Sequence, residues 1–238
     1  MERLKITRQS LETDQMEPLT DYDDMQLSEV DKISRAKWRT QAETSELFNS
    51  KTLDNFDSRK QPIAHKVIKN YDLIGGVSVI FSSPDIYGVG KTHLAYALIN
   101  RFLTESPAAY TTAWGCVVSS SIPVYFSTEN KLLSRIRMTY QDGAPENEEM
   151  IYNTLRSKRM IIIDDVGKVK PRDYNFLQNV YFRIIDDRYN DKKAIMITTN
   201  LDFKNLESHI GGASADRLHE MCSGNIVKMT GTSQRVPK

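Results

Sequence analysis

Residues 82–94, Ser-Ser-Pro-Asp-Ile-Tyr-Gly-Val-Gly-Lys-Thr-His-Leu, decide the fold of this chain. They follow a β-branched run at 77–81 and open a segment in which apolar residues recur at helical spacing as far as Phe102. A glycine-rich loop between a strand and a helix is typical of a phosphate-binding loop, because its backbone N–H groups and the helix N-terminus face an anion. The sequence therefore predicts a nucleotide site at this loop.

The residues expected to bind ATP are Gly88, Val89, Gly90, Lys91, Thr92 and His93. Lys91 would reach the β- and γ-phosphates, and the Thr92 hydroxyl would coordinate Mg²⁺. One position departs from the pattern G-x-x-x-x-G-K-[ST], because Asp85 replaces the first glycine. An aspartate near a triphosphate is repulsive unless its side chain turns away. Three interpretations stay open: a working loop, a loop that binds nucleotide but hydrolyses it poorly, and a chance match.

A second landmark is the run Met-Ile-Ile-Ile-Asp-Asp at 160–165. A continuous apolar run suits a parallel strand that is buried on both faces, and its acids then emerge at the carboxyl edge, where ligands bind in open α/β sheets. Asp164 would hold Mg²⁺ through water, and Asp165 would polarise the attacking water. The alternative is a pair of acids that simply ends a strand in a turn.

A further buried strand is expected at 194–200, ending in Asn200. This amide could contact the γ-phosphate or position water, or it could simply begin a turn. Strands are also expected at 123–127 and 226–229. Strands that alternate with helices predict an α/β fold, a three-layer P-loop NTPase with a central parallel sheet. Between two of these elements, residues 106–123 form either a small hairpin or a binding loop.

The predicted organisation is a short N-terminal arm, 1–46, followed by an ATPase domain, 47–238. Within the arm, Ser28-Glu29-Val30-Asp31 resembles a capping box and predicts a helix that begins at Ser28 and continues through Trp38. The arm either packs Trp38 back on the domain or provides a docking helix for a partner protein.

The composition of the chain indicates its cellular compartment but does not identify a binding partner. Lys and Arg number 32 against 31 Asp and Glu, so any contact with nucleic acid must come from a local patch. Cys116 and Cys222 match no metal or redox spacing, which favours a reducing cytosol. No apolar run approaches the ~20 residues that span a bilayer, and the N-terminus lacks a signal-peptide core. We expect a cytoplasmic protein without a membrane partner.

Three stretches closely resemble the AAA+ ATPases of the DnaC/DnaI helicase-loader group, which includes IstB-like transposition helpers. They read Gly-Val-Gly-Lys-Thr-His-Leu-Ala at 88–95, Ile-Ile-Ile-Asp-Asp-Val-Gly-Lys-Val-Lys-Pro at 161–171 and Ile-Thr-Thr-Asn-Leu at 197–201. A weaker fourth is Asp-Arg-Leu at 216–218 with Met-Thr-Gly at 229–231. The resemblance runs from about residue 47 to the end, while the arm lacks the cysteine cluster of zinc-bearing loaders.

The resemblance implies roles that spacing alone does not give. Asp164 and Asp165 look like a Walker B pair, and Asn200 looks like sensor 1. Arg217 looks like an arginine finger that reaches the nucleotide of a neighbouring subunit, and Arg235 lies where a sensor 2 arginine would be. A finger supplied by a neighbour implies a homo-oligomer with ATP sites between subunits.

The helix after residue 127 lies where such loaders are expected to contact single-stranded DNA. Its basic residues Lys131, Arg135 and Arg137 are the candidates, although an exposed basic face is often only solvated.

Three functions follow from these patterns. The first is an ATP-dependent loader that delivers a replicative helicase, bound through the arm, onto single-stranded DNA. The second is a transposition helper that binds duplex DNA and a transposase. The third is an adaptor that binds nucleotide structurally and does not hydrolyse it.

Overall fold

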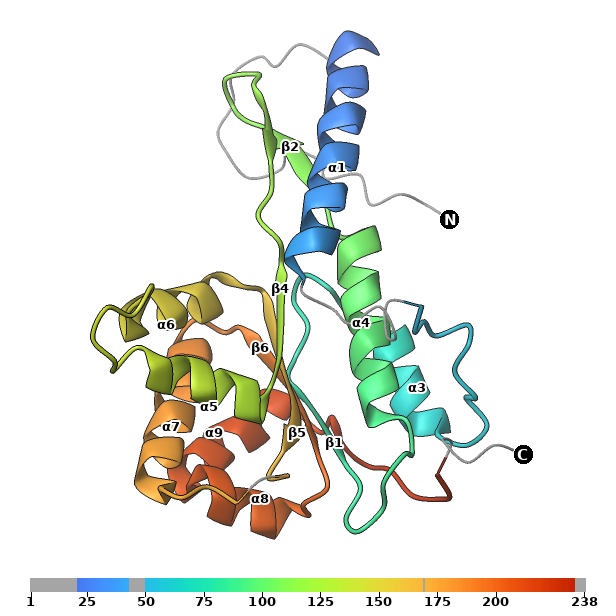
Figure 1. Cartoon of the computed structure of the whole chain (residues 1–238). Helices are drawn as coiled ribbons and strands as arrows, with labels where there is room; N and C mark the ends of the chain where they lie inside the picture. The colour runs from blue at the N-terminus through green and yellow to red at the C-terminus, as the bar shows by residue number, and fades with distance from the viewer. Residues whose placement is uncertain (1–20, 43–49, 169, 234–238) are drawn as a thin grey trace.

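A five-stranded parallel sheet organises the computed structural model, which describes residues 21–42, 50–168 and 170–233 (Figure 1). The strand order is β4-β5-β6-β1-β7, with every neighbouring pair parallel. The strands are β1 (Val79–Ser82), β4 (Val124–Thr128), β5 (Met160–Val166), β6 (Ala194–Thr199) and β7 (Ile226–Lys228). The predicted α/β fold and its five expected strands are confirmed, and β1 lies beside β6, one strand from β5.

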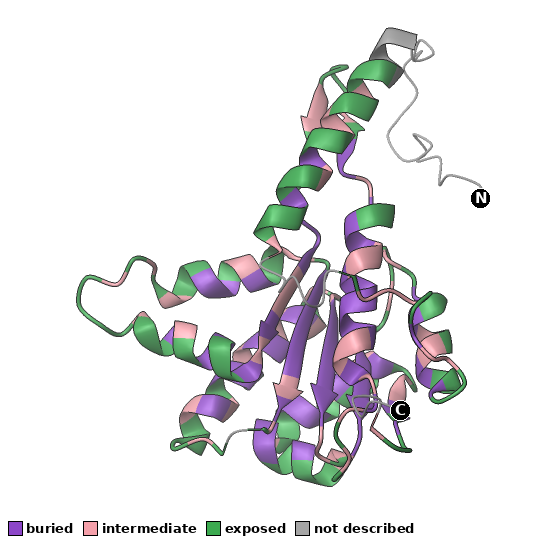
Figure 2. Ribbon diagram, turned by 45° about the vertical axis from the view of Figure 1, so that its right-hand side comes forward, coloured by how far each residue is buried: buried purple, intermediate pink, exposed green. Residues whose placement is uncertain are grey.

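Helices cover both faces of the sheet, so the molecule has three layers (Figures 1 and 2). One face packs on α3 (Pro62–Lys69) and α4 (Lys91–Glu105), while α1 (Asp21–Gln41) contacts the C-terminal end of α4. The other packs on α5 (Glu129–Met138), α6 (Glu148–Ser157), α7 (Tyr174–Asn190), α8 (Phe203–Ile210) and α9 (Gly212–Cys222). Successive side chains of a strand point to opposite faces, so Ile162 joins the first apolar cluster and Ile161 and Ile163 join the second. Fully burying each such side chain contributes about 1.5–3 kcal/mol.

Side-chain caps explain where several helices begin. Thr128, Asn147, Asp173 and Asp202 each accept a hydrogen bond from the backbone N–H three residues later, at the starts of α5, α6, α7 and α8. Short polar side chains are favoured at this position because they satisfy an N–H that has no partner inside the helix. In the described part of the chain, no helix combines the length and apolar character that a bilayer crossing needs.

The arm helix α1 begins earlier than the sequence predicted. Asp21 starts the helix, so the expected start at Ser28 is wrong and this serine lies inside α1. Residues 21–28 contain neither glycine nor proline, and the helix continues through them despite the capping-box pattern. The expected packing of Trp38 is confirmed: its ring is buried and its indole N–H donates to the Ser120 carbonyl over 3.0 Å.

The 106–123 segment forms a hairpin. β2 (Ala109–Thr111) pairs antiparallel with β3 (Val117–Ser119), and α1 lies along this two-stranded ribbon (Figure 1). The ribbon and α1 project together from the three-layer core.

Arg188 ties α7 to the C-terminal end of α6 and to the start of β6. Its side chain is buried and its guanidinium donates to four backbone carbonyls over 2.7–3.1 Å, those of Leu155, Lys158, Arg159 and Ala194. Burial lowers the pKa of Arg188 to about 10, which still leaves it charged at neutral pH. The planar fork of arginine suits this set of acceptors, and lysine could not reach all four.

Replacing Arg188 by Met should lower the free energy of unfolding by about 3 kcal/mol, because four backbone carbonyls lose their donor and two of them, those of Leu155 and Ala194, belong to buried residues. Urea unfolding followed by circular dichroism measures the change. Arg183→Met on the same helix is the matched control, since Arg183 bonds an exposed glutamate at the surface. Equal losses in the two variants would contradict the structural role of Arg188.

Candidate functional site

The loop after β1 begins the site at the carboxyl edge of the sheet. The Ser83 N–H donates to the Thr199 carbonyl over 3.1 Å, which ties the start of the loop to the end of β6. Gly88 and Gly90 have φ angles of 77° and 103°, in the left-handed region that glycine enters without a steric penalty. Gly90 caps α4, and its carbonyl accepts the first helical bond from Leu94 over 3.0 Å. The loop therefore turns directly into a helix N-terminus, as a phosphate site requires.

Lys91 and Asn200 meet between the ends of β1 and β6. The Lys91 ammonium is buried and donates to Asn200 Oδ1 over 2.6 Å and to the Ser83 hydroxyl. The Ser83 hydroxyl in turn donates to the Ile86 carbonyl over 2.7 Å, inside the loop. The structure thus brings the predicted lysine and the predicted amide into direct contact.

Thr92 and Asp164 form the second half of the site. The Thr92 hydroxyl lies 3.1 Å from each carboxylate oxygen of Asp164, and Thr198 donates to the same carboxylate. Burial raises the pKa of Asp164, and the negative charge of Asp165 adds to this, while hydrogen bonds from Thr198 and Thr92 oppose it. A cation beside this carboxylate would favour its ionised form. Hydroxyl and carboxylate oxygens are also the ligands that Mg²⁺ takes, so these residues fit the predicted ion.

Asp165 lies next to this pair but has a different partner. It has a φ of 58°, at an irregularity where the register between β5 and β6 shifts, and its N–H donates to the Thr198 hydroxyl over 3.0 Å. Its half-buried carboxylate forms an ion pair with Lys168 over 2.8 Å. The Thr199 hydroxyl closes the irregularity by donating to the Val166 carbonyl over 2.8 Å.

Glu129 is a buried acid that supports the turn after Asp165. Its carboxylate accepts bonds from the Gly167 N–H over 2.9 Å and from Tyr181 and His209, each over 2.8 Å. Gly167 has a φ of 77°, and an added Cβ would lie 2.3 Å from Leu201 Cδ1, so only glycine fits there. Glu129 therefore joins the start of α5 to the segment that presents the two aspartates.

Sequence reasoning missed Ser83, Thr198 and Glu129 as parts of this site. Ser83 and Thr198 carry a usable signal, because a hydroxyl at the end of a buried apolar strand must find a hydrogen-bond partner. Glu129 has no such signal, since its partners come from α7, α8 and the turn at Gly167, which are distant in sequence.

The structure places His93 away from the loop amides. Its Nε2 donates to the Thr52 carbonyl over 2.8 Å, and its ring meets the edge of Phe56 with centroids 5.1 Å apart. Burial lowers the pKa of His93. His93 fixes the segment before α3 against α4.

Arg217 packs against α7. It forms an ion pair with Asp186 over 3.2 Å, and its guanidinium lies 5.1 Å from the Phe182 ring centroid. One of its terminal nitrogens, Nη1, is buried without a hydrogen-bond partner. Arg235 lies outside the described residues.

The three basic candidates on α5 differ in their surroundings. Lys131 is exposed, whereas Arg135 forms a two-point ion pair with Glu146 over 2.6 Å. This pairing raises the pKa of Arg135. Arg137 is exposed and lies 4.7 Å from the centre of the Phe176 ring.

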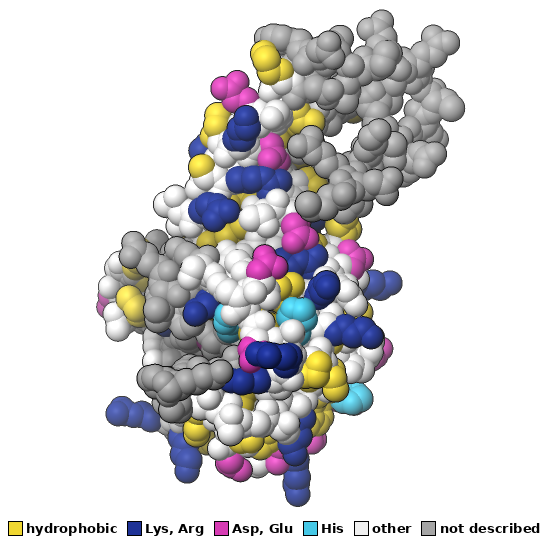
Figure 3. Space-filling model, turned by 90° about the vertical axis from the view of Figure 1, so that its right-hand side faces the viewer, with side chains coloured by type: hydrophobic (Ala, Val, Ile, Leu, Met, Phe, Trp, Pro, Cys, Tyr) yellow, Lys and Arg dark blue, Asp and Glu magenta, His cyan; other side chains and the backbone are white. Residues whose placement is uncertain are grey.

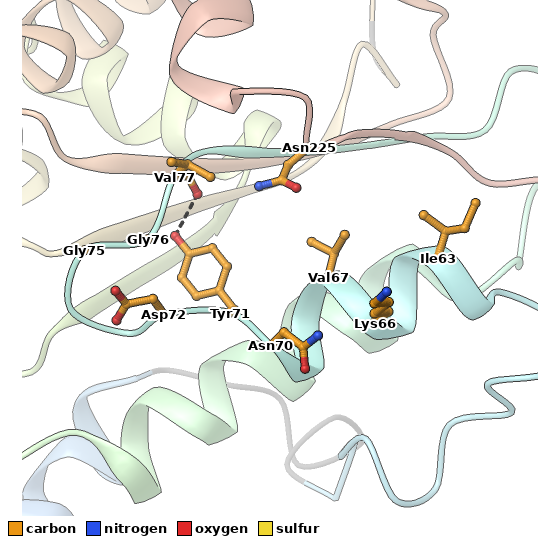
Figure 4. A pocket seen from close by; sticks show the side chains of 10 residues that line it. All are labelled: Ile63, Lys66, Val67, Asn70, Tyr71, Asp72, Gly75, Gly76, Val77 and Asn225. Atoms are coloured by element: carbon orange, nitrogen blue, oxygen red, sulfur yellow. Dashed lines mark hydrogen bonds between the residues drawn. The ribbon is translucent and has the colours of Figure 1, made fainter. Parts of the chain in front are cut away.

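A separate hollow of about 410 Å³ lies beside α3, away from the loop (Figure 4). Val77 and Asn225, which line it, precede β1 and β7, so it lies toward the amino ends of these strands. The Tyr71 hydroxyl donates to the Val77 carbonyl over 2.9 Å at its edge. It contains none of the residues of the loop site. Within 21–42, 50–168 and 170–233, no group of three or more His, Cys, Asp or Glu side chains could hold a metal ion.

The family of IstB-like ATP binding proteins matches residues 12–238. The chain belongs to this family. Its AAA+ P-loop fold and ATP-binding class, which the sequence predicted, are thereby confirmed.

Two relatives and one solved structure are similar to this family member. The "Replicative helicase loader DnaC" of Buchnera aphidicola subsp. Baizongia pistaciae is 27% identical over 156 residues, which cover 65% of this chain and 53% of the relative. The "Insertion sequence IS21 putative ATP-binding protein" of Pseudomonas aeruginosa is 27% identical over 188 residues, covering 74% and 62%. The chain thus spans between about half and two thirds of their lengths. A crystal structure of the DnaC helicase loader aligns with a TM-score of 0.58 at 20% identity, covering 78% of this chain and all of the other.

The backbone conformation of Asp85 shows why the loop can carry aspartate where the usual pattern has glycine. It has a φ of 59°, the left-handed conformation that glycine would supply, and it is exposed. Aspartate tolerates this region better than most residues. Its charge points to solvent, where salt screens it.

Replacing Asp85 by Gly should raise the free energy of unfolding by about 1 kcal/mol, because the positive φ no longer carries a penalty. Asp85→Asn keeps a residue that tolerates this φ and removes only the charge. We expect it to change the dissociation constant of a fluorescent ATP analogue by less than about threefold. A tenfold gain in affinity for Asp85→Asn would instead show that the carboxylate faces the phosphates.

Proposed function

We propose that this family member is an ATP-dependent loader that delivers a replicative helicase onto single-stranded DNA. The observation that carries the proposal is the joined site in which Lys91 contacts Asn200 and Thr92 contacts Asp164. A glycine loop, a lysine, two acids and an amide at one sheet edge are the parts that ATP hydrolysis needs. The similarity to a replicative helicase loader favours loading among the uses of such a site.

Each residue has a distinct role in this proposal. The loop amides at 88–92 and the N-terminus of α4 bind the phosphates. Lys91 turns from Ser83 and Asn200 to the β- and γ-phosphates, which frees the Asn200 amide to orient water. Thr92 and Asp164 would hold Mg²⁺, which when bound supplies positive charge against the phosphates.

Asp165 is the proposed base for the attacking water. In the structure its carboxylate pairs with Lys168, and both groups are partly exposed. Such a pair is weak, so it can separate when nucleotide binds. Glu129 holds the backbone of the turn while this exchange occurs, because its bond is to the Gly167 N–H rather than to Asp165.

A second candidate is a transposition helper that acts on duplex DNA. The similarity to an insertion-sequence ATP-binding protein covers a larger share of this chain than the similarity to the helicase loader. A third candidate is an adaptor that binds nucleotide without turnover. The loop and the contact between Lys91 and Asn200 would serve nucleotide binding in the loader, the transposition helper and the adaptor alike. The dependence of ATP hydrolysis on DNA distinguishes the three functions.

ATP hydrolysis by the purified chain should be measured with single-stranded DNA, with duplex DNA and without DNA. We expect stimulation by single strands and a loss of 10²-fold or more in Asp165→Asn, because the amide cannot accept the proton from water. Asparagine tolerates the φ of 58° at this position, so the variant should keep its fold and its affinity for ATP. Stimulation by duplex DNA alone would favour the transposition helper. Bound nucleotide without turnover would favour the adaptor.

Arg217 is proposed to complete the ATP site of a neighbouring subunit. Its ion pair with Asp186 joins two partly exposed groups, and its buried Nη1 has no partner, so little free energy opposes its release from α7. Arg217→Ala should therefore keep ATP binding by the isolated subunit but lower turnover about 10³-fold in the assembled state.

Mixing Arg217→Ala with Lys91→Ala subunits checks this role directly. In an equal mixture, about a quarter of the interfaces join an intact loop to an intact arginine, so turnover should partly return. Failure of the mixture to regain turnover, with assembly intact, would remove Arg217 from the shared site. Arg183→Ala provides a control, because it removes an arginine from the surface of α7 that faces α6.

A further inference from the structure

An aromatic tip marks the outer end of the arm. Trp114 is 91% exposed in the turn that joins β2 to β3, and Tyr110 on β2 is 51% exposed. Met25 near the start of α1 is 63% exposed. We call Met25, Tyr110 and Trp114 the arm tip. The three-layer core and the ATP site use none of these side chains.

The ribbon that presents Trp114 is fixed to α1 by hydrogen bonds. Asp31 accepts from the Ala108 N–H over 3.0 Å, and Arg35 donates to the Leu103 and Ser106 carbonyls over 2.9 and 2.8 Å. Ser34 donates to the Ser119 hydroxyl over 2.7 Å. These bonds fix the backbone of the ribbon that carries Trp114, so binding through this residue would order little additional backbone.

These contacts also set the direction of the ribbon along α1. Ser106 bonds Arg35, and Ala108, two residues later, bonds Asp31, one turn earlier in α1. The segment that leads to the β2–β3 turn therefore runs toward the N-terminal end of α1. The six residues from 108 to 114 extend up to about 20 Å, while the six from Asp31 to Met25 rise about 9 Å. The turn between β2 and β3, which carries Trp114, therefore lies beside the outer turns of α1, and Figure 1 shows the turn there.

Charge distinguishes the tip from a nucleic-acid surface. No residue from 106 to 128 is charged, so the ribbon has no cation to meet a phosphate backbone. On the described part of α1, the acid Glu29 is exposed and Asp31 is partly exposed. The exposed basic residues Lys32, Lys37 and Arg39 follow nearer the core, and Figure 3 shows charged side chains of both signs along this side of the arm.

We propose that Trp114 is the anchor by which this chain docks on a partner protein, in an apolar pocket of that partner. Tryptophan and tyrosine dominate protein interfaces when they fill pockets, and the uncharged ribbon beside Trp114 suits burial against an apolar surface. The proposal deepens the loader function above and rests on it for the partner, the replicative helicase. It assigns the docking contact to the 106–123 hairpin together with α1.

Tryptophan fluorescence gives a direct test, because Trp114 is exposed and Trp38, the second tryptophan of the chain, is buried. Acrylamide quenching of the full chain should fall when the purified replicative helicase of the same genome is added. Trp114→Ala should weaken helicase binding at least tenfold, while ATP affinity stays unchanged. Met150→Ala is the matched control, since it removes another exposed apolar side chain, on α6.

The outcomes separate this inference from the loader function. Helicase binding without protection of Trp114, or with full affinity in Trp114→Ala, overturns the anchor and leaves the loader function intact. Absence of helicase binding by the native chain overturns the loader function, and the transposase of the same element then replaces helicase as the probe. Protection by neither protein overturns the anchor as well. Protection of Trp114 by oligo(dT), with weaker binding of oligo(dT) by Trp114→Ala, would assign the tip to single-stranded nucleic acid instead.

Discussion

The contact of Lys91 with Asn200 and Ser83 is the constraint on which the site depends. A buried ammonium requires hydrogen-bond acceptors, and here they come from the ends of two adjacent strands, β1 and β6. Asp164, equally buried, lies close enough for the positive charge of Lys91 to lower its pKa in part. Burial still dominates, so the net shift of that pKa is upward. The site thus places a buried cation near an acid whose pKa is raised, and Mg²⁺ beside that acid would favour its ionised form.

The sheet order explains why distant stretches of sequence meet at this point. β1 lies next to β6, and β6 next to β5, so the three carboxyl ends form one continuous edge. Thr198 serves both neighbours, because its hydroxyl donates to Asp164 and accepts from the Asp165 N–H. A single threonine therefore holds two acids in different orientations. This arrangement leaves Asp164 facing Thr92 and leaves Asp165 free to pair with Lys168.

The sequence predicted the sheet and the loop because both depend on local chemistry. Apolar β-branched runs, the glycines of the loop and the acids at a strand end each carry their own signal. The N-terminal boundary of α1 was predicted wrongly, because the capping-box pattern at Ser28 lies inside a helix that begins at Asp21, and tertiary contacts stabilise only the part of α1 that follows Ser28. Those contacts join Asp31, Arg35 and Trp38 to a ribbon about 70–85 residues later. Helix α6 was also missed, because only Ile151, Tyr152 and Leu155 mark its buried face.

The buried bonds of Glu129 show why the acids at the strand end need support from outside their own strand. Asp165, at the end of β5, has a positive φ that is costly for a residue other than glycine, and the turn at Gly167 follows two residues later. Glu129 offsets this by accepting the Gly167 N–H, and Tyr181 and His209 hold its other oxygen. The carboxylate belongs to the first turn of α5, the helix whose exposed basic residues are the candidates for DNA contact. A shift of α5 would therefore act on the turn after Asp165 through Glu129, and on Asp164 through Thr128, which caps α5 and pairs with Asp164 in the sheet.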